Sequence, residues 1–308
     1  MVGQKKYACL LIGLGLFMNG APVTLYGQGA EGINLKNVEM ARAVIRGEQV
    51  YERACTPCHG LNGDGNGPFS GPLSPKPRDF TKGKFKFRTT TSRSLPSDQD
   101  LFNTISKGIP GTFMPAWKDL LSEEDRMNVV QYIKTFSPRF TSSVLTIEQI
   151  DVSNEIPYSD ESAAMGRKFY EVLECVKCHG ETGRGDGPSA KDLKDEWGYP
   201  LPSRNLTQSW TFRGGNTGFD IYCRLMSGIT GAAMPSVAES FNLDDELLEI
   251  QIKVEDGEEV TAEEQKRLDA AMAKIRQNIW HLVNYIKSLS RSQSLLHRLF
   301  VEDTEVTK

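Results

Sequence analysis

The sequence is short of several features that would place it in common protein classes. Only four of its 308 residues are histidines. The net charge is −4 at pH 7, so basic residues do not outnumber acidic ones. Beyond residue 18, no segment is apolar enough to span a membrane. The central parts of the chain also lack the alternation of apolar and polar residues that long strands show. These absences argue against nucleic-acid binding and favour an all-α fold.

The one long apolar run stands at the N-terminus. Two lysines precede the apolar residues 7–18, and the Asn-Gly-Ala-Pro segment 19–22 ends the run. Because twelve residues are few for a bilayer crossing, we predict an export signal in residues 1–30 and a periplasmic protein. The alternative is an uncleaved signal that anchors the protein in the membrane.

Cysteine is scarce as well, and four of the six cysteines fall in two copies of Cys-x-x-Cys-His that lie 120 residues apart. The copies comprise Cys55, Cys58 and His59, and Cys175, Cys178 and His179. This pattern is the attachment signature of c-type haem. The two sulfurs add to the haem vinyl groups, and the adjacent histidine binds the iron. We therefore predict two covalently bound haem c groups.

A Met-Pro pair follows each motif at the same distance. Met114 and Met234 each lie 55 residues after the histidine of their motif. A thioether sulfur in the sixth position favours ferrous iron and raises the reduction potential, whereas an open position suits substrate chemistry. We predict that both methionines are iron ligands, which indicates electron transfer.

Cys-x-x-Cys has two other interpretations, a zinc site and a thioredoxin-like redox pair. A zinc site would have to bring together cysteines 120 residues apart and would leave the adjacent histidines unexplained. A thioredoxin-like pair would need a βαβ pattern around it, and none is present. Haem attachment is therefore the favoured interpretation.

The two motifs belong to a repeat that covers most of the chain. Segments 60–68 and 180–188 share four glycines and a proline in register, and segments 107–115 and 227–235 lead to the two Met-Pro pairs. The shared Tyr-Ile-Lys at 132–134 and 285–287 shows 33 additional residues in the second copy. Duplication of one haem-binding unit explains this pattern.

The repeat predicts a set of local features. Short helices precede the motifs, with Gly47 and Gly166 where two helices approach closely. Another helix spans about 98–107, and a final helix follows Ser122. Each motif histidine needs a fixed acceptor for its second ring nitrogen. In the class I cytochrome c fold, which the motifs resemble, this acceptor is a backbone carbonyl of the following loop, and Gly67-Pro68 and Gly187-Pro188 are candidates at matching positions. Arginines repeated in register are candidates for pairing with the haem carboxylates: Arg78, Arg88, Arg204 and Arg213.

At this point the residues resemble the class I cytochrome c family, once in each half of the chain. The resemblance implies crossing terminal helices and loops wrapped around each haem, with His59 and Met114 on the first iron and His179 and Met234 on the second. It divides the chain into a first domain (31–137), a linker (138–159) and a second domain (160–308) with the 33-residue insertion before its last helix. Segments around 77–81 and 87–90 are also similar to dihaem cytochromes that accompany periplasmic molybdenum oxidoreductases.

Charge is distributed unevenly along the chain. Residues 76–93 hold seven bases and one acid, whereas residues 239–269 hold twelve acids and three bases. Such asymmetry could steer an acidic partner to the first domain and a basic partner to the second. The alternative is a solvated surface with an amphipathic helical hairpin.

The prediction is an exported dihaem cytochrome c, not an enzyme, that passes single electrons from a periplasmic oxidoreductase to another redox carrier or a terminal oxidase. One alternative is a dihaem enzyme of the peroxidase or thiosulfate dehydrogenase type, in which one haem has an open, exchangeable or thiolate sixth ligand; Cys223 could supply this ligand only if Met234 left the iron. Another is a fixed subunit of a respiratory complex, docked through residues 249–273. We expect Cys223 to be a buried apolar residue, and we assign no ligand role to His281 or His297.

Overall fold

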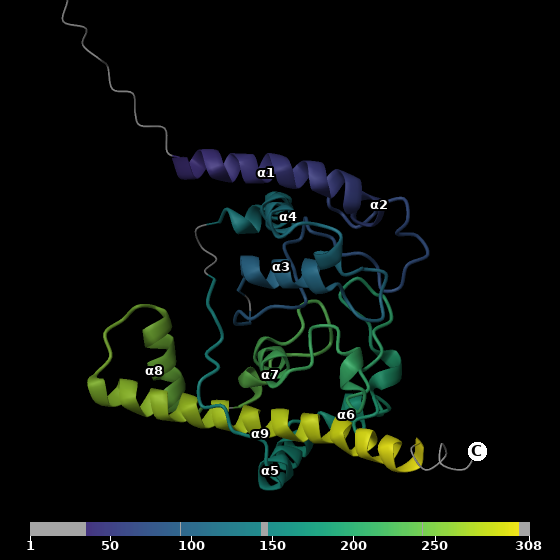
Figure 1. Ribbon diagram of the computed structural model, residues 1–308. Helices are drawn as coiled ribbons and strands as arrows, with labels where there is room; N and C mark the ends of the chain where they lie inside the picture. Colours follow the sequence, from purple (N-terminus) through teal and green to yellow (C-terminus); the bar gives the residue numbers. More distant parts are fainter. Residues whose placement is uncertain (1–34, 93, 143–146, 242, 302–308) are drawn as a thin grey trace, which may run out of the picture.

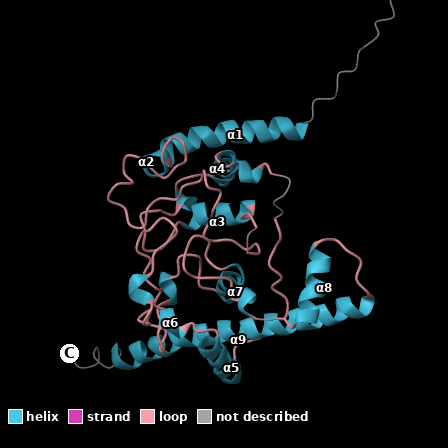
Figure 2. Ribbon diagram, turned by 180° about the vertical axis from the view of Figure 1, so that it is seen from behind, coloured by secondary structure: helices cyan, strands magenta, loops and turns pink. Residues whose placement is uncertain are grey.

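The computed structural model describes residues 35–301 except 93, 143–146 and 242, so the predicted signal 1–30 lies outside the described residues. Over this part of the chain the fold consists of helices and loops, without strands (Figure 2). The all-α prediction is therefore confirmed. None of the helices in these ranges is both long and apolar enough to cross a membrane.

The first domain is built on the crossing of two helices, α1 (Leu35–Ala54) and α4 (Glu123–Thr135), at the top of Figure 1. Between them lie α2 (Thr56–His59), α3 (Asp98–Lys107) and η1 (Trp117–Asp119), and η2 (Pro138–Phe140) follows. The crossing depends on Gly47, because a Cβ there would lie 2.0 Å from the backbone oxygen of Asn128. Tyr51 and Val130 are fully buried at this contact.

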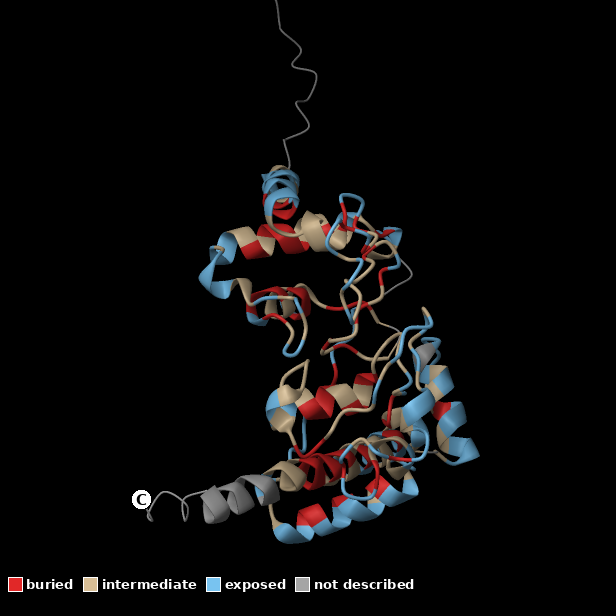
Figure 3. Cartoon of the chain, turned by 90° about the vertical axis from the view of Figure 1, so that its right-hand side faces the viewer, coloured by how far each residue is buried: buried red, intermediate tan, exposed pale blue. Residues whose placement is uncertain are grey.

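The second domain repeats this plan with α5 (Asp160–Val172), α6 (Val176–His179), α7 (Gly218–Ser227) and α9 (Ala262–Val301). Short turns η3 (Ala190–Asp192), η4 (Ser209–Thr211) and η5 (Ala238–Ser240) lie in its loops. Gly166 takes the place of Gly47, and a Cβ there would lie 2.0 Å from the backbone oxygen of His281. Figure 3 shows the buried residues gathered in two separate layers, one for each domain.

Capping residues fix where α3 and α7 begin. Ser97 and Asp100 form a capping box at the start of α3, and Thr217 and Asp220 form the same box at α7.

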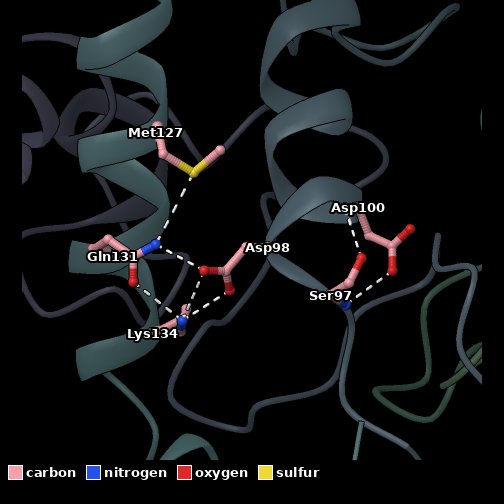
Figure 4. Close-up of polar contacts among 6 residues, drawn as sticks. All are labelled: Ser97, Asp98, Asp100, Met127, Gln131 and Lys134. Atoms are coloured by element: carbon pink, nitrogen blue, oxygen red, sulfur yellow. Dashed lines mark hydrogen bonds and ion pairs between the residues drawn. The ribbon is translucent and has the colours of Figure 1, made fainter. Parts of the chain in front are cut away.

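Asp98 joins α3 to α4, because it accepts hydrogen bonds from Lys134 at 2.8 Å and from Gln131 at 2.8 Å (Figure 4).

The insertion forms a helical hairpin from α8 (Asp245–Glu255) and the first turns of α9. Ile250 and Leu268 are buried within it, and Arg267 makes two hydrogen bonds with Glu246 across it, at 2.5 and 2.8 Å. The acidic segment is therefore the amphipathic hairpin that the sequence offered as one interpretation.

The linker is attached to both domains. On one side, the backbone N–H of Thr91 donates to Glu148 O at 2.9 Å. On the other side, Tyr222 donates to Asp151 O at 3.1 Å and the Asn284 amide to Ile156 O at 3.0 Å. The linker therefore ties the two domains to each other, and α3 of the first lies opposite α7 of the second in Figures 1 and 2.

Much of the basic segment 76–93 contacts the second domain. Arg78 lies over the ring of Trp197 at 4.6 Å, and Lys86 lies 5.8 Å from the same ring. Lys84 forms an ion pair with Glu196. These residues hold the domains together, so less of the basic segment is left to steer a partner than the sequence suggested.

We expect Trp197→Ala to loosen the contact between the domains. The indole interacts with two cations, and each such contact contributes about 0.5–2 kcal/mol. Small-angle X-ray scattering should show an increased radius of gyration, and protease should cut the linker faster. Trp210→Ala is the control, because that ring is exposed elsewhere on the second domain. Unchanged scattering in Trp197→Ala would show that the ring does not hold the interface.

Candidate functional site

Each Cys-x-x-Cys-His segment forms one helical turn after the first helix of its domain, and with 20 residues α1 is longer than the short helix that the sequence predicted. In the first copy, the N–H of His59 donates to Cys55 O at 2.9 Å, and in the second the N–H of His179 donates to Cys175 O at 2.8 Å. The second copy has one more residue between its glycine and its first cysteine, and Glu174, with φ at 58°, accommodates it. The turn places both sulfurs and the imidazole of each motif close together.

The ring of each motif histidine is held in one tautomer. Nδ1 of His59 donates to Arg78 O at 3.1 Å, and Nδ1 of His179 donates to Arg204 O at 2.9 Å. Burial lowers the pKa of both histidines, so both rings are neutral at pH 7. A neutral ring with its proton on Nδ1 leaves the Nε2 lone pair free to bind a metal.

The expectation that Gly67-Pro68 and Gly187-Pro188 supply these acceptors is wrong. These glycines instead press their loop against the motif turn, since a Cβ on Gly67 would lie 2.4 Å from Thr56 O. Gly187 makes the same close approach to Lys177 O. The acceptor carbonyls come from farther along the loop, at the arginines of the two repeats.

The first domain contains a cavity against its motif. Cys55, Cys58 and His59 line it together with Met114, so the four residues that the sequence singled out share one site. The rest of the lining is largely apolar and includes Phe80, Phe85, Leu101, Ile105, Trp117, Val129 and Ile133. In the second domain, Cys175 and Met234 both pack against the same hydrophobic core.

Repeated turns position both methionines. The N–H of Ile109 donates to Met114 O at 3.1 Å, and that of Ile229 donates to Met234 O at 2.9 Å. Gly108 and Gly228 precede these turns with φ of 64°, a conformation that glycine adopts without strain. Because the sequence between glycine and methionine has the same length in both copies, the two turns are alike.

One part of the first cavity is cationic. Lys76, Arg78 and Lys86 line it, and so does Arg213 of the second domain. The Nε atom of Arg213 is buried without a hydrogen-bond partner among the described residues. Haem carries two carboxylates on an otherwise apolar ring, so an apolar cavity with cations and an unpartnered N–H group fits it.

The four motif cysteines do not come together. Cys55 packs against the core of the first domain and Cys175 against that of the second. Burial raises the pKa of Cys55 to about 12 and that of Cys175 to about 11. In the described ranges, no three His, Cys, Asp or Glu side chains are grouped to hold a metal ion. Each pair is thus set beside its own histidine.

Comparison with known proteins agrees with this geometry. Residues 42–133 match the family model for cytochrome c oxidase, cbb3-type, subunit III, and residues 163–290 match that for cytochrome c. A chain of the Kuenenia stuttgartiensis reducing HAO-like protein complex Kustc0457/Kustc0458 is 38% identical, with a TM-score of 0.64. That match covers 79% of this chain and 95% of the solved one. The chain belongs to the dihaem c-type cytochromes.

Comparison with curated proteins finds no match. The two cytochrome c domains carry two covalently bound haem c groups, at Cys55 and Cys58 and at Cys175 and Cys178. Haem c supplies a one-electron iron couple, so the cytochrome is an electron-transfer protein.

Several residues of this cytochrome were not predicted from its sequence. Tyr51 and Tyr170 donate to the carbonyls of Gly60 and Gly180, which fixes the start of each glycine loop. The loop with Trp197 lies in a stretch where the second copy is six residues longer, because Arg78 and Arg204 are 126 residues apart and the motifs 120. This extra length was its only signal in the sequence.

The structure describes the surroundings of His281 and Cys223, two residues outside the haem motifs. Nδ1 of His281 contacts Ser162 Oγ at 2.8 Å, which ties α9 to α5, while the side chain of His297 lies outside the described residues. Cys223 is 2% exposed in the core of the second domain, and burial raises its pKa to about 12. The surroundings of His281 and Cys223 are those of residues that pack the core of the domain.

We expect Cys223→Ala to leave the absorption spectra of both haems unchanged, because a buried thiol with a raised pKa is a poor ligand. The native protein should also resist alkylation at Cys223 at pH 8 and react after unfolding. Spectra of the ferric and ferrous variant beside the parent, with mass spectrometry of alkylated protein, provide the check. A change confined to the second haem in Cys223→Ala would support thiolate ligation.

Proposed function

We propose that this cytochrome is exported to the periplasm and passes single electrons between an oxidoreductase and a downstream redox carrier or terminal oxidase. In this proposal His59 and Met114 bind the first iron, and His179 and Met234 the second. The observation that carries it is the first cavity, which a neutral histidine, a methionine and both cysteines line together.

Methionine in the sixth position distinguishes a carrier from an enzyme. With two protein ligands on each iron, no position is left for a substrate, and the electron must pass through the haem edge. The buried surroundings of Cys223 support the carrier, because they argue against Cys223 as the thiolate ligand of an enzyme.

The two haem sites differ in their surroundings. Phe113 lines the first cavity next to Met114, yet 72% of its surface is exposed. Its counterpart in the repeat is Ala233, and the acidic hairpin is present in the second domain alone. This inequality supports different redox partners for the two domains.

A fixed subunit of an oxidoreductase complex is the second candidate. The similar solved chain is part of a reducing HAO-like protein complex, which supports a partner of the oxidoreductase type. A molybdenum oxidoreductase remains a prediction from the sequence resemblance.

Spectroscopy of the purified holoprotein tests whether the protein is an electron carrier. Both ferric haems should be low-spin, both should show the methionine–iron charge-transfer absorption at the red end of the spectrum, and neither should bind azide or turn over peroxide. A high-spin haem would favour the enzyme. Gel filtration of a mild native extract distinguishes the free carrier, which elutes alone, from a subunit, which elutes with a large redox partner.

Export has its own test. The N-terminal sequence of the protein from the periplasmic fraction should begin between residues 21 and 31. Recovery of the intact chain in the membrane fraction would instead indicate an anchor.

A further inference from the structure

The arginines that repeat in register cross between the domains. Arg88 belongs to the first domain, but its Nη2 donates to Ser227 O of the second at 3.0 Å, and its Nη1 contacts Thr230. Arg213 is its counterpart in the second domain, and it lines the haem cavity of the first.

The two crossed arginines differ in what they bind. Arg88 finds its acceptors in the turn that leads to Met234. In the first domain the residue that corresponds to Thr230 is Pro110, which has no side-chain acceptor for Arg213. The Nε of Arg213 is buried and unpartnered, and no hydrogen bond of its guanidinium to described residues is found.

The charge of Arg213 is also uncompensated by any carboxylate of the described residues. Burial and the neighbouring Arg204 both lower its pKa, and no carboxylate opposes them. For comparison, Glu196, Asp195 and Asp79 offset the burial of Arg78. Arg213 is half-buried, and its buried Nε has no anion beside it among the described residues, which is costly, so the site favours a negative group from outside this part of the chain.

We propose that Arg213 completes the haem site of the first domain by pairing with a haem carboxylate across the domain interface. The first haem is then held by residues of both domains, and its potential depends on the docking of the second. This inference rests on haem c in the first cavity and not on the proposed methionine ligands or partners.

The sign of the effect follows from electrostatics. A cation beside the haem stabilises the ferrous form, which carries one positive charge fewer, so its removal lowers the reduction potential. We expect Arg213→Gln to shift the ferric to ferrous ratio of the first haem about tenfold towards ferric, or about 59 mV for one electron. The second haem should move much less.

Assignment of the two haems needs a spectral tag. Cys55→Ala leaves one vinyl group unreacted on the first haem, which moves its visible band to longer wavelength, and Cys175→Ala tags the second haem in the same way. Redox titration at the two bands then reads each potential separately, whichever residue is the sixth ligand. The methionine–iron absorption is recorded on the same samples, so failure of the proposed axial ligands is seen independently.

Two variants control for charge and folding. Arg213→Lys keeps the cation and should restore most of the first haem's potential. Arg42→Gln removes an exposed cation on α1 of the first domain and should change neither haem. The proposal is wrong if Arg213→Gln shifts the second haem alone, shifts both haems equally, or shifts neither, or if Arg213→Lys fails to restore the potential in protein that carries both haems.

Discussion

Met114→Ala is expected to abolish the methionine–iron charge-transfer absorption of the first haem and to lower its reduction potential by about 120 mV, a hundredfold shift in the ferric to ferrous ratio. The reason is the preference of a soft thioether for ferrous iron, which water or a replacement ligand does not share. Redox titration followed at the visible bands measures the potential.

The same change in the second domain, Met234→Ala, should remove the other half of that absorption. Met40 and Met165 supply matched controls, since both are exposed and lie on α1 and α5 away from the methionine turns. Their alanine variants should keep both the absorption and the potentials. If Met234→Ala leaves the spectrum intact, the second iron has another ligand, and the enzyme alternative gains weight.

Gly166→Ala is expected to destabilise the second domain by about 3 kcal/mol, at the upper end for overpacking. A Cβ would stand 2.0 Å from the backbone oxygen of His281, and a backbone atom cannot turn away as a side chain can. The gain in helix propensity, about 1 kcal/mol, is too small to compensate. Gly47→Ala should act likewise on the first domain.

Guanidinium unfolding, followed by circular dichroism and by haem absorption, gives the midpoints. Gly71→Ala is the matched control, because its Cβ would meet nothing within 4 Å and its φ is not in the left-handed region. Its midpoint should stay near that of the parent. Equal midpoints for Gly166→Ala and Gly71→Ala would mean that the helices separate at little cost.

The helices could be predicted because their signals are local. α3 spans Asp98–Lys107, as Ser97, Asp100 and the following glycine indicate. α4 follows its cap at Ser122. The close approach at Gly47 and Gly166 was also predictable, since the repeat places a glycine at the same point of two amphipathic helices.

The histidine acceptors show where such reasoning fails. Every residue carries a backbone carbonyl, and the sequence does not distinguish one carbonyl from another. Only its position in the loop therefore supported the choice of Gly67-Pro68. The path of the loop decides which carbonyl meets the ring, and it brings Arg78 O and Arg204 O there.

By itself, the sequence of this cytochrome determined the number of haems, the cysteines that attach them, and the helices around them, because each depends on residues within a turn or two of one another. Only the tertiary structure decided that Trp197 and the basic segment hold the domains together and that Arg213 lines the cavity of the other domain. Those contacts join segments more than a hundred residues apart, and packing of the two domains alone brings them together.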